Sequence, residues 1–290
     1  MKAFDVGKWS KWKILWLDSD RIDECMHFFQ KNKIDGIGIS PYKGKFKLND
    51  LSFLENFDPE IIKGVVIPSG EQIDITGIEK LKVIKFISIS DNKQFVDFSL
   101  FPQLEEIRNG WHSKMKIEKC VNLKHLYLRK YSPTTKDLTE LSELKTLEQL
   151  YIIQSPINSI KGVGELKKLR ELELSYVPKL EMLTDLENIA DSLEVLFMQN
   201  CKNLKNHEYA KKLQKLKTLV YLSCGEIPTI KFIDQMPNLV DFRFSRTNVV
   251  DGNLTPCLRL DYTAFDNKKH YSHKFEEIKK IVEEGKTKMK

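Results

Sequence analysis

The stretch INSIKGVGELKKLRELELS (residues 157–175) contains one complete unit of a pattern that recurs along the chain. In its second half, leucines stand at positions 169, 172 and 174, separated first by two variable residues and then by one. The closing alternation is typical of a short β-strand that buries one face. Gly162 and Gly164 come before it, where a turn is expected. The stretch therefore predicts a turn followed by a strand in every unit.

The same spacing of apolar residues repeats over most of the chain. Seven intervals between Ile84 and Leu239 cover 155 residues, or about 22 residues each. The triplets are Trp12-Leu15-Leu17, Ile34-Ile37-Ile39, Ile62-Val65-Ile67, Ile84-Ile87-Ile89, Leu104-Ile107 (partial), Leu123-Leu126-Leu128, Leu147-Leu150-Ile152, Leu169-Leu172-Leu174, Leu193-Leu196-Met198, Leu219-Leu222-Cys224, Leu239-Phe242-Phe244 and Leu258-Leu260. No single unit can bury its apolar face alone, so neighbouring units must stack into one continuous core.

The segments LEQLYI (147–152), LRELEL (169–174) and LEVLFMQNC (193–201) resemble leucine-rich repeats. Residues 157–175 are most similar to the short 22-residue subclass found in internalins and in a phosphatase-regulating nuclear protein. The resemblance implies an α/β solenoid: an arc with a parallel sheet on its concave face and a ladder of Asn or Cys after the strands. Asn200-Cys201 fits that ladder, whereas Ser155-Pro156 and Val177-Pro178 make it irregular. The Ile- and Lys-rich composition indicates a bacterial source.

The two ends of the chain predict caps that shield the open core of the solenoid. We expect an N-terminal cap unit over residues 1–33, in which Ser19 or Asp20 caps a helix running to about Asn32. The repeats then cover 34–262. Residues 263–290 are expected to form a C-terminal capping helix that ends near Gly285, followed by a frayed basic tail. Its apolar stripe would be Phe275, Ile278, Ile281 and Val282.

The composition predicts an ordinary globular protein of the cytoplasm. Charged residues make up 30% of the chain, and 47 Lys and Arg against 41 Asp and Glu give a net charge of +6. Residues 266–290 carry eight Lys and five acids, and so hold half of that excess. The longest apolar runs fall far short of the ~20 residues that span a bilayer, and we see no secretory signal. The five cysteines include no C-x-x-C pair, so we expect buried reduced thiols.

Catalytic and metal-binding patterns are scarce, and we predict neither an enzyme nor a bound cofactor. The chain has no phosphate loop, no G-x-S-x-G elbow and no H-E-x-x-H pair. His270 and His273 have a metal-like spacing, but only Cys257 and Asp266 are candidates to complete a zinc site. Glu171 and Glu173 form a carboxylate pair, which on a leucine-rich strand is explained by two consecutive outward positions.

The residues between the apolar positions of each strand are the candidate binding residues. They include Tyr and Arg, which are enriched at the hot spots of protein interfaces. Their charge is zoned along the chain, which suits a protein partner better than a uniform phosphate backbone. The glycines at 36, 38 and 64 would contribute no side chain. The predicted concave-face residues are Arg108, Trp111, His125, Tyr127, Arg129, Gln149, Tyr151, Glu171, Glu173, Phe197, Gln199, Tyr221 and Arg243.

These observations favour a monomeric, non-catalytic module that binds another protein through the concave sheet. A narrower hypothesis is that the partner is a toxin or enzyme that the chain inhibits, as ribonuclease inhibitors of this fold do. The alternative is binding of nucleic acid or an anionic surface through Lys268, Lys269, Lys274, Lys279 and Lys280. Two further possibilities stay open: the exposed aromatic residues pack only on one another, or a convex or edge surface is used instead.

Overall fold

The computed structural model describes residues 4–40, 42–68, 72–90, 92 and 94–288. The chain forms two compact units, residues 1–128 and residues 129–290, called unit 1 and unit 2 below. Strand β7 (His125–Arg129) contains the point at which the chain is divided. This division falls inside the predicted repeat region.

Unit 1 begins with an antiparallel hairpin of β1 and β2, called the N-terminal hairpin below. From β2 onward the strands pair in parallel and in chain order. The hairpin turns at Ser10, which has a φ of 54°. The strands are β1 (Asp5–Trp9), β2 (Trp12–Trp16), β3 (Gly36–Gly38), β4 (Gly64–Ile67), β5 (Phe86–Ile89) and β6 (Glu106–Gly110). Strand β1 was not predicted, because it carries none of the repeat pattern.

Unit 2 continues the same parallel pairing, one strand to each repeat. A separate parallel pair, β12 with β14, joins two of its loops. The strands are β8 (Gln149–Ile153), β9 (Glu171–Ser175), β10 (Val195–Gln199), β11 (Thr218–Leu222), β12 (Glu226–Ile227), β13 (Asp241–Arg243), β14 (Asn248–Val249) and β15 (Tyr262–Ala264).

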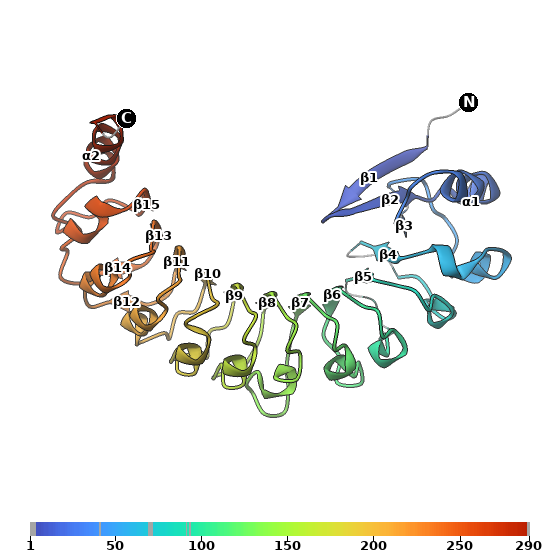
Figure 1. Cartoon of the computed structure of the whole chain (residues 1–290), viewed down its shortest axis with the longest axis horizontal. Coiled ribbons are helices and arrows are strands. Elements are labelled where there is room, and N and C mark those ends of the chain that lie inside the picture. The colour runs from blue at the N-terminus through green and yellow to red at the C-terminus, as the bar shows by residue number, and fades with distance from the viewer. Residues whose placement is uncertain (1–3, 41, 69–71, 91, 93, 289–290) are drawn as a thin grey trace. The chain divides into compact units, whose positions relative to one another are not determined.

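Short 3-10 helices return the chain from one strand to the next. Within unit 2 the main strands line the inner side of a curve and these helices lie on its outer side (Figure 1), so the inner side is the concave face. The 3-10 helices of the chain are η1 (Ser19–Arg21), η2 (Ser52–Asn56), η3 (Pro59–Ile61), η4 (Ile78–Lys80), η5 (Phe98–Leu100), η6 (Ile117–Lys119), η7 (Thr139–Leu141), η8 (Val163–Glu165), η9 (Leu186–Ile189), η10 (His207–Lys212), η11 (Lys231–Gln235) and η12 (Thr255–Arg259).

The predicted apolar triplets form the core between the strands and the 3-10 helices. Leu147, Leu150 and Ile152 are fully buried, as are Leu169, Leu172 and Leu174 in the next repeat. Burial of such rows removes apolar surface from water only because neighbouring repeats stack. The architecture therefore confirms the predicted solenoid of parallel strands.

The residue after each of the strands β8, β9, β10 and β11 has a repeated backbone conformation. Gln154, Tyr176, Asn200 and Ser223 all have φ between 54° and 58°, the left-handed region. The N–H of each donates to a carbonyl of the next repeat, as from Tyr176 to Gln199. The following residue occupies the ladder slot: Ser155 donates to the carbonyl of Tyr131, and the Cys201 thiol lies 3.4 Å from the carbonyl of Leu174. The slot also holds Val177, so the ladder is irregular.

Both ends of the chain contain a helix, as predicted, but the two helices differ from the predictions in detail. Helix α1 (Ile22–Lys31) buries Cys25, Met26 and Phe29. The N-terminal turn is capped by Asp18, whose side chain accepts from the N–H of Asp20 at 3.1 Å, and not by Ser19 or Asp20.

At the C-terminus, helix α2 (Phe275–Lys288) does not end near Gly285 but runs through it. Ile278 is fully buried, whereas Ile281 is 45% exposed, so the predicted apolar stripe is only partly used. The last two residues of the predicted basic tail lie outside the described residues.

Two of the predicted repeat positions are wrong by a few residues. In β11, Leu219 pairs with Leu196 and Tyr221 pairs with Met198, so this repeat uses Leu216-Leu219-Tyr221 and not Leu219-Leu222-Cys224. The last strand is β15, beyond the predicted Leu258-Leu260 unit, of which Leu258 lies in η12 and Leu260 directly follows it. The first error arises because Leu219, Leu222 and Cys224 reproduce the same spacing three residues later. The second arises because Leu258 lies in the turn before the strand.

Candidate functional site

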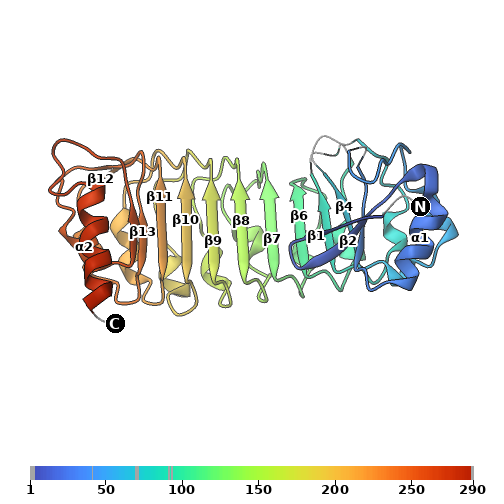
Figure 2. The ribbon, with the colours of Figure 1, turned by 90° about the horizontal axis from the view of Figure 1, so that it is seen from above.

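The concave face of unit 1 is filled by the chain itself. Trp12, Ile14 and Trp16 of the N-terminal hairpin form a buried cluster with Val66 and Phe86. The rings of Trp12 and Phe86 stack with their centroids 4.7 Å apart. In Figure 2, the hairpin crosses over the strands that follow it in unit 1. This part of the sheet therefore presents little of its face to a partner.

The glycines predicted to contribute no side chain make room for these aromatic rings. A Cβ atom at Gly64 would lie 2.1 Å from Cε1 of Phe86, and one at Gly38 would lie 2.4 Å from Cε3 of Trp16. Atoms that are not bonded cannot approach so closely. Glycine is therefore required at these positions because an aromatic side chain lies too close to the backbone for any Cβ atom.

A buried carboxylate anchors the hairpin to the sheet. Glu106 on β6 is 2% exposed and accepts a hydrogen bond from Nε1 of Trp12 at 3.0 Å and one from Nε of Arg108 at 2.9 Å. Nδ1 of His125 lies 3.8 Å from the same carboxylate. Two predicted binding residues, Arg108 and His125, therefore have an intramolecular partner.

The surroundings of Glu106 keep it ionised. Burial opposes ionisation, but the His125 imidazole, the Arg108 charge and the Trp12 N–H outweigh that effect and hold the pKa of Glu106 below its ordinary value. The adjacent Glu105 binds Lys11 and Lys85, each at 3.2 Å. The hairpin is thus fixed by an apolar cluster, a buried hydrogen bond and a partly exposed ion pair.

The concave face of unit 2 is open in comparison. No other segment of unit 2 crosses β8, β9, β10 or β11 in Figure 2. The register places Tyr151, Glu173, Phe197, Val220 and Arg243 in one row across these strands and β13. Of these, Tyr151, Glu173 and Phe197 are half-buried and Arg243 is exposed, while Val220 is buried. The row therefore offers aromatic surface beside both signs of charge.

The neighbouring rows add a carboxylate pair and more apolar surface. Gln149 donates to Glu171 at 2.9 Å, and Ser175 donates to Glu173 at 2.7 Å. Arg243 pairs with Asp241 at 2.6 Å and lies 4.8 Å from the ring centre of Tyr262. Leu222, the last residue of β11, is half-buried and adds apolar surface to the face. These contacts fix the orientation of the polar side chains in the free chain.

The structure distributes the predicted site residues over both units. In unit 1, Arg108, His125 and Tyr127 lie on the last two strands, and Trp111 follows β6; all four are half-buried. In unit 2, the half-buried residues are Arg129, Gln149, Tyr151, Glu171, Glu173, Phe197 and Gln199, and Arg243 is exposed. Arg129 donates to Gln154 at 3.2 Å.

Tyr221 is the predicted site residue that the structure places elsewhere. It is fully buried, its hydroxyl donates to the carbonyl of His207 at 3.1 Å, and its ring packs edge-on against Phe242. The true face residues of this repeat, Val220 and Leu222, were not among the predicted site residues. The ladder could have revealed the correct register of this repeat. Cys201 and Cys224 occupy the same ladder slot in consecutive repeats, and aligning them places Val220 and Leu222 at the outward positions of the strand.

His207 is a buried titratable group near this tyrosine. The ring is fully buried and its Nε2 bonds the carbonyl of Cys224. Burial disfavours the imidazolium and lowers the pKa of His207, against the smaller effect of the Cys224 carbonyl. The ring therefore has a structural role in the folded core of unit 2.

The Lys-rich C-terminal segment is less available than the sequence implies. Nζ of Lys268 donates to Asn248 at 2.7 Å, and Nζ of Lys274 donates to the carbonyl of Lys268 at 2.7 Å. Lys280 lies 3.8 Å from Glu284. Two of the five lysines thus hold the cap together, and a third faces an acid.

The part of the chain that the structure describes has no grouped metal ligands and no exposed thiol. There, no three His, Cys, Asp or Glu side chains are grouped to hold a metal ion, and His270 instead bonds the carbonyl of Val249 at 3.0 Å. All five cysteines are buried and free, as predicted. Burial raises the pKa of Cys120 and of Cys257 to about 12, which leaves both thiols unreactive. None of the helices within residues 4–288 is long and apolar enough to cross a membrane.

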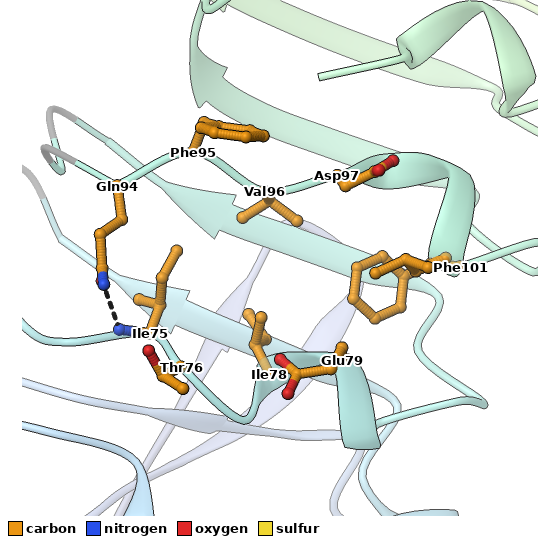
Figure 3. Close-up of a pocket in the computed structure, with 10 residues that line it drawn as sticks. Ile75, Thr76, Ile78, Glu79, Gln94, Phe95, Val96, Asp97 and Phe101 are labelled. Atoms are coloured by element: carbon orange, nitrogen blue, oxygen red, sulfur yellow. Dashed lines mark hydrogen bonds between the residues drawn. The ribbon is translucent and has the colours of Figure 1, made fainter. Parts of the chain in front are cut away.

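Unit 1 also has an apolar groove outside its sheet (Figure 3). It has a volume of about 530 Å³ and lies between the segments leading into η4 and η5. Phe95 and Leu100, 40% and 43% exposed, form part of its wall. Gln94 closes one end by accepting from the N–H of Ile75 at 2.7 Å, and Asp97 is paired with Lys116 at 2.8 Å. The polar groups around this groove are therefore used within the chain.

Comparisons with solved structures agree on the fold. The functional domain of InlJ from Listeria monocytogenes, which includes a cysteine ladder, is 15% identical, with a TM-score of 0.59 over 81% of this chain and 54% of that domain. A leucine-rich repeat protein of Leptospira interrogans is 15% identical, with a TM-score of 0.57 over 83% of this chain and 68% of that one. The internalin InlF of Listeria monocytogenes is 13% identical, with a TM-score of 0.54 over 89% and 83%.

This likeness shows that the chain has the leucine-rich repeat fold, as the sequence resemblance predicted. The chain spans about half the length of the InlJ domain. No known family model matches the sequence. None of the curated proteins matches it either.

Proposed function

We propose that this leucine-rich repeat chain binds another protein through the concave face of unit 2. The observation that carries the proposal is the contrast between the two sheets: the face of unit 1 is filled by the N-terminal hairpin, while that of unit 2 presents Tyr151 and Phe197 beside Glu173 and Arg243. Large aromatic side chains next to fixed charges are typical of interface hot spots.

The chemistry of the face describes the partner. The carboxylates of Glu171 and Glu173 favour a cationic side chain, and the apolar strip from Tyr151 through Phe197 to Leu222 favours an aliphatic or aromatic one. The hydrogen bonds from Gln149 and Ser175 leave further lone pairs on both carboxylates. A partner protein with an apolar projection beside a lysine or arginine would fit.

The test is capture of the partner from cells of the source organism, with crosslinking and mass spectrometry. Tyr151→Ala combined with Phe197→Ala should reduce recovery of the partner at least about tenfold, since hot-spot truncations cost roughly 2 kcal/mol or more. The matched control is Met182→Ala, which removes a side chain that is 44% exposed outside the strands. Equal recovery with both variants, or no protein recovered above background, would contradict the proposal.

The identity of the captured protein decides the narrower hypothesis. A toxin or enzyme that loses activity when bound would make the chain an inhibitor. A partner that stays active in the complex would reject this role and leave the binding face intact.

Binding of nucleic acid through the C-terminal lysines stays an alternative, and no contact in the structure favours it. Titration with DNA and RNA at low salt tests it, because counterion release makes such binding strongest there. Undetectable binding at low salt would eliminate this alternative.

A further inference from the structure

A second surface of unit 2 has the features of a binding site, and it is separate from the concave face. A groove of about 530 Å³ lies beyond the carboxyl ends of β8, β9 and β10. Its lining includes Pro156, Tyr176, Pro178, Lys179, Asn200 and Lys202, which come from three consecutive repeats. We call it the edge groove.

Tyr176 is an unusual residue for its position in the fold. The repeat requires a left-handed backbone there, and the φ of Tyr176 is 58°. This conformation is costly for a bulky residue and is best tolerated by glycine and asparagine. The equivalent positions of the neighbouring repeats hold Gln154 and Asn200, whereas Tyr176 places an aromatic ring that is 48% exposed. The fold does not need this ring, so its presence points to a contact outside the chain.

The charge around the edge groove is of one sign. Lys179 and Lys202 line it, and its lining contains no Asp or Glu. Among the residues that the structure describes, no carboxylate pairs with either lysine. Other lysines of unit 2 do have one: Lys145 binds Glu165 at 3.0 Å, Lys205 binds Glu181 at 2.7 Å and Lys217 binds Glu194 at 2.7 Å. The two groove lysines are therefore available to an anion.

The apolar part of the groove defines the rest of the ligand. Pro156, in the loop after β8, and Pro178, in the loop after β9, line the groove together with Tyr176 and give it an apolar surface. The side chain of Asn200 can both donate and accept a hydrogen bond, as the backbone of an extended peptide requires. Two lysines are too few to bind a nucleic-acid backbone, because such binding requires a longer row of positively charged side chains.

We propose that the edge groove binds an acidic peptide segment of a protein partner, which places an apolar side chain against Tyr176 and its carboxylates on Lys179 and Lys202. This site is independent of the proposed concave interface. Its loss would leave binding at Tyr151 and Phe197 unchanged.

The experiment screens the whole chain against a displayed library of random twelve-residue peptides. The selected peptides should be enriched in Asp and Glu around an apolar residue, and their affinity should fall with rising salt, as expected for exposed charges. Absence of enrichment, or selection of basic or neutral peptides, would overturn the proposal.

Variants then place the selected peptides on the groove. Tyr176→Asn removes the ring and suits the left-handed backbone, so the variant should fold, and it should weaken binding at least about tenfold. Lys179→Glu with Lys202→Glu should abolish binding. The controls are Tyr262→Ala, whose ring is 49% exposed on β15, and Lys231→Glu on η11; both should bind as the unaltered chain does.

Unchanged affinity of Tyr176→Asn or of the double lysine variant would overturn the assignment. A second probe, a thymidine oligonucleotide, distinguishes the other class of anion. Binding of this oligonucleotide that is lost in the same variants, and is tighter than that of the selected peptides, would also overturn the proposal.

Discussion

The two units use the same repeat but treat the concave face of the sheet in opposite ways. In unit 1, the glycines at 36, 38 and 64 let Trp16 and Phe86 approach the backbone closely, and the hairpin covers the face. In unit 2, the equivalent positions carry larger side chains with no hairpin to cover them. This difference indicates that the residues at the outward strand positions determine whether the face of a leucine-rich sheet is covered by the chain itself or stays open.

The carboxylates on the two faces show the same contrast. Glu106 in unit 1 is buried and takes hydrogen bonds from distant parts of the unit, including Trp12. Glu171 and Glu173 in unit 2 are half-buried and bond only near neighbours. Glu171 stands at the same position of its repeat as Glu106, so an acid at this position is structural in one unit and a candidate contact in the other.

The largest expected effect comes from removing the ring that seals unit 1. Trp12→Ala should destabilise unit 1 by roughly 3–5 kcal/mol, because it leaves a cavity beside Phe86 and deprives the buried Glu106 of a donor. All four tryptophans belong to unit 1, so the fluorescence of the other three can follow its unfolding in denaturant. Phe197→Ala in unit 2 should cost only about 1 kcal/mol. Equal losses would mean that the two faces do not differ as described.

A smaller effect is expected from filling the space that glycine leaves open. Gly64→Ala should cost about 1–3 kcal/mol, because the new methyl group collides with the Phe86 ring. The matched control is Gly7→Ala on β1, where the nearest atom, Nε1 of Trp16, is 3.4 Å away, and a change within about 0.5 kcal/mol is expected. Denaturant midpoints of both variants provide the comparison, and a neutral Gly64→Ala would contradict the packing described.

The two units should respond to acid in different pH ranges. Because burial lowers the pKa of His207 in the folded state, the unfolded chain takes up a proton first, and unit 2 should lose stability as the pH falls below about 6.5. Glu106 has a lowered pKa, so its contribution to unit 1 is present above about pH 4.5 and is lost on further acidification.

Denaturant unfolding at pH 7, 5.5 and 4 can measure this difference, with tryptophan fluorescence for unit 1 and circular dichroism for the whole chain. His207→Gln should flatten the change between pH 7 and 5.5 and leave the fluorescence transition unaltered. The role assigned to His207 would be contradicted if the circular dichroism midpoint of the unaltered chain did not change between pH 7 and 5.5.

The smallest expected effect concerns the ion pair between the hairpin and β6. Lys11 is 49% exposed in its pair with Glu105, so Lys11→Ala should cost less than about 1 kcal/mol, and added salt should change little. The fluorescence transition of unit 1 in low and high salt checks this. A loss as large as that of Trp12→Ala would mean that charge, and not apolar packing, holds the hairpin.

The sequence predicts the repeats well because each one obeys a local rule. Apolar spacing placed the parallel strands and the helix of the N-terminal cap. It failed at Tyr221, because Leu219, Leu222 and Cys224 reproduce the same spacing three residues later, and only the ladder slot distinguishes the two registers. The hydrogen bond from Trp12 to Glu106 joins residues 94 apart in the chain, and no local pattern can reveal such a pair. The edge groove is formed by loops of three consecutive repeats, and no local pattern in the sequence predicts how these loops pack together.

The central claim is that the concave face is closed in unit 1 and open for a partner in unit 2. Hydroxyl-radical footprinting of the free chain and of its complex with the captured partner tests it most directly, by mass spectrometry of single side chains. Tyr151 and Phe197 should be oxidised in the free chain and protected in the complex, while Trp12 and Phe86 should resist oxidation in both. Rapid oxidation of Trp12 and Phe86 in the free chain, or unchanged oxidation of Tyr151 and Phe197 on binding, would contradict it.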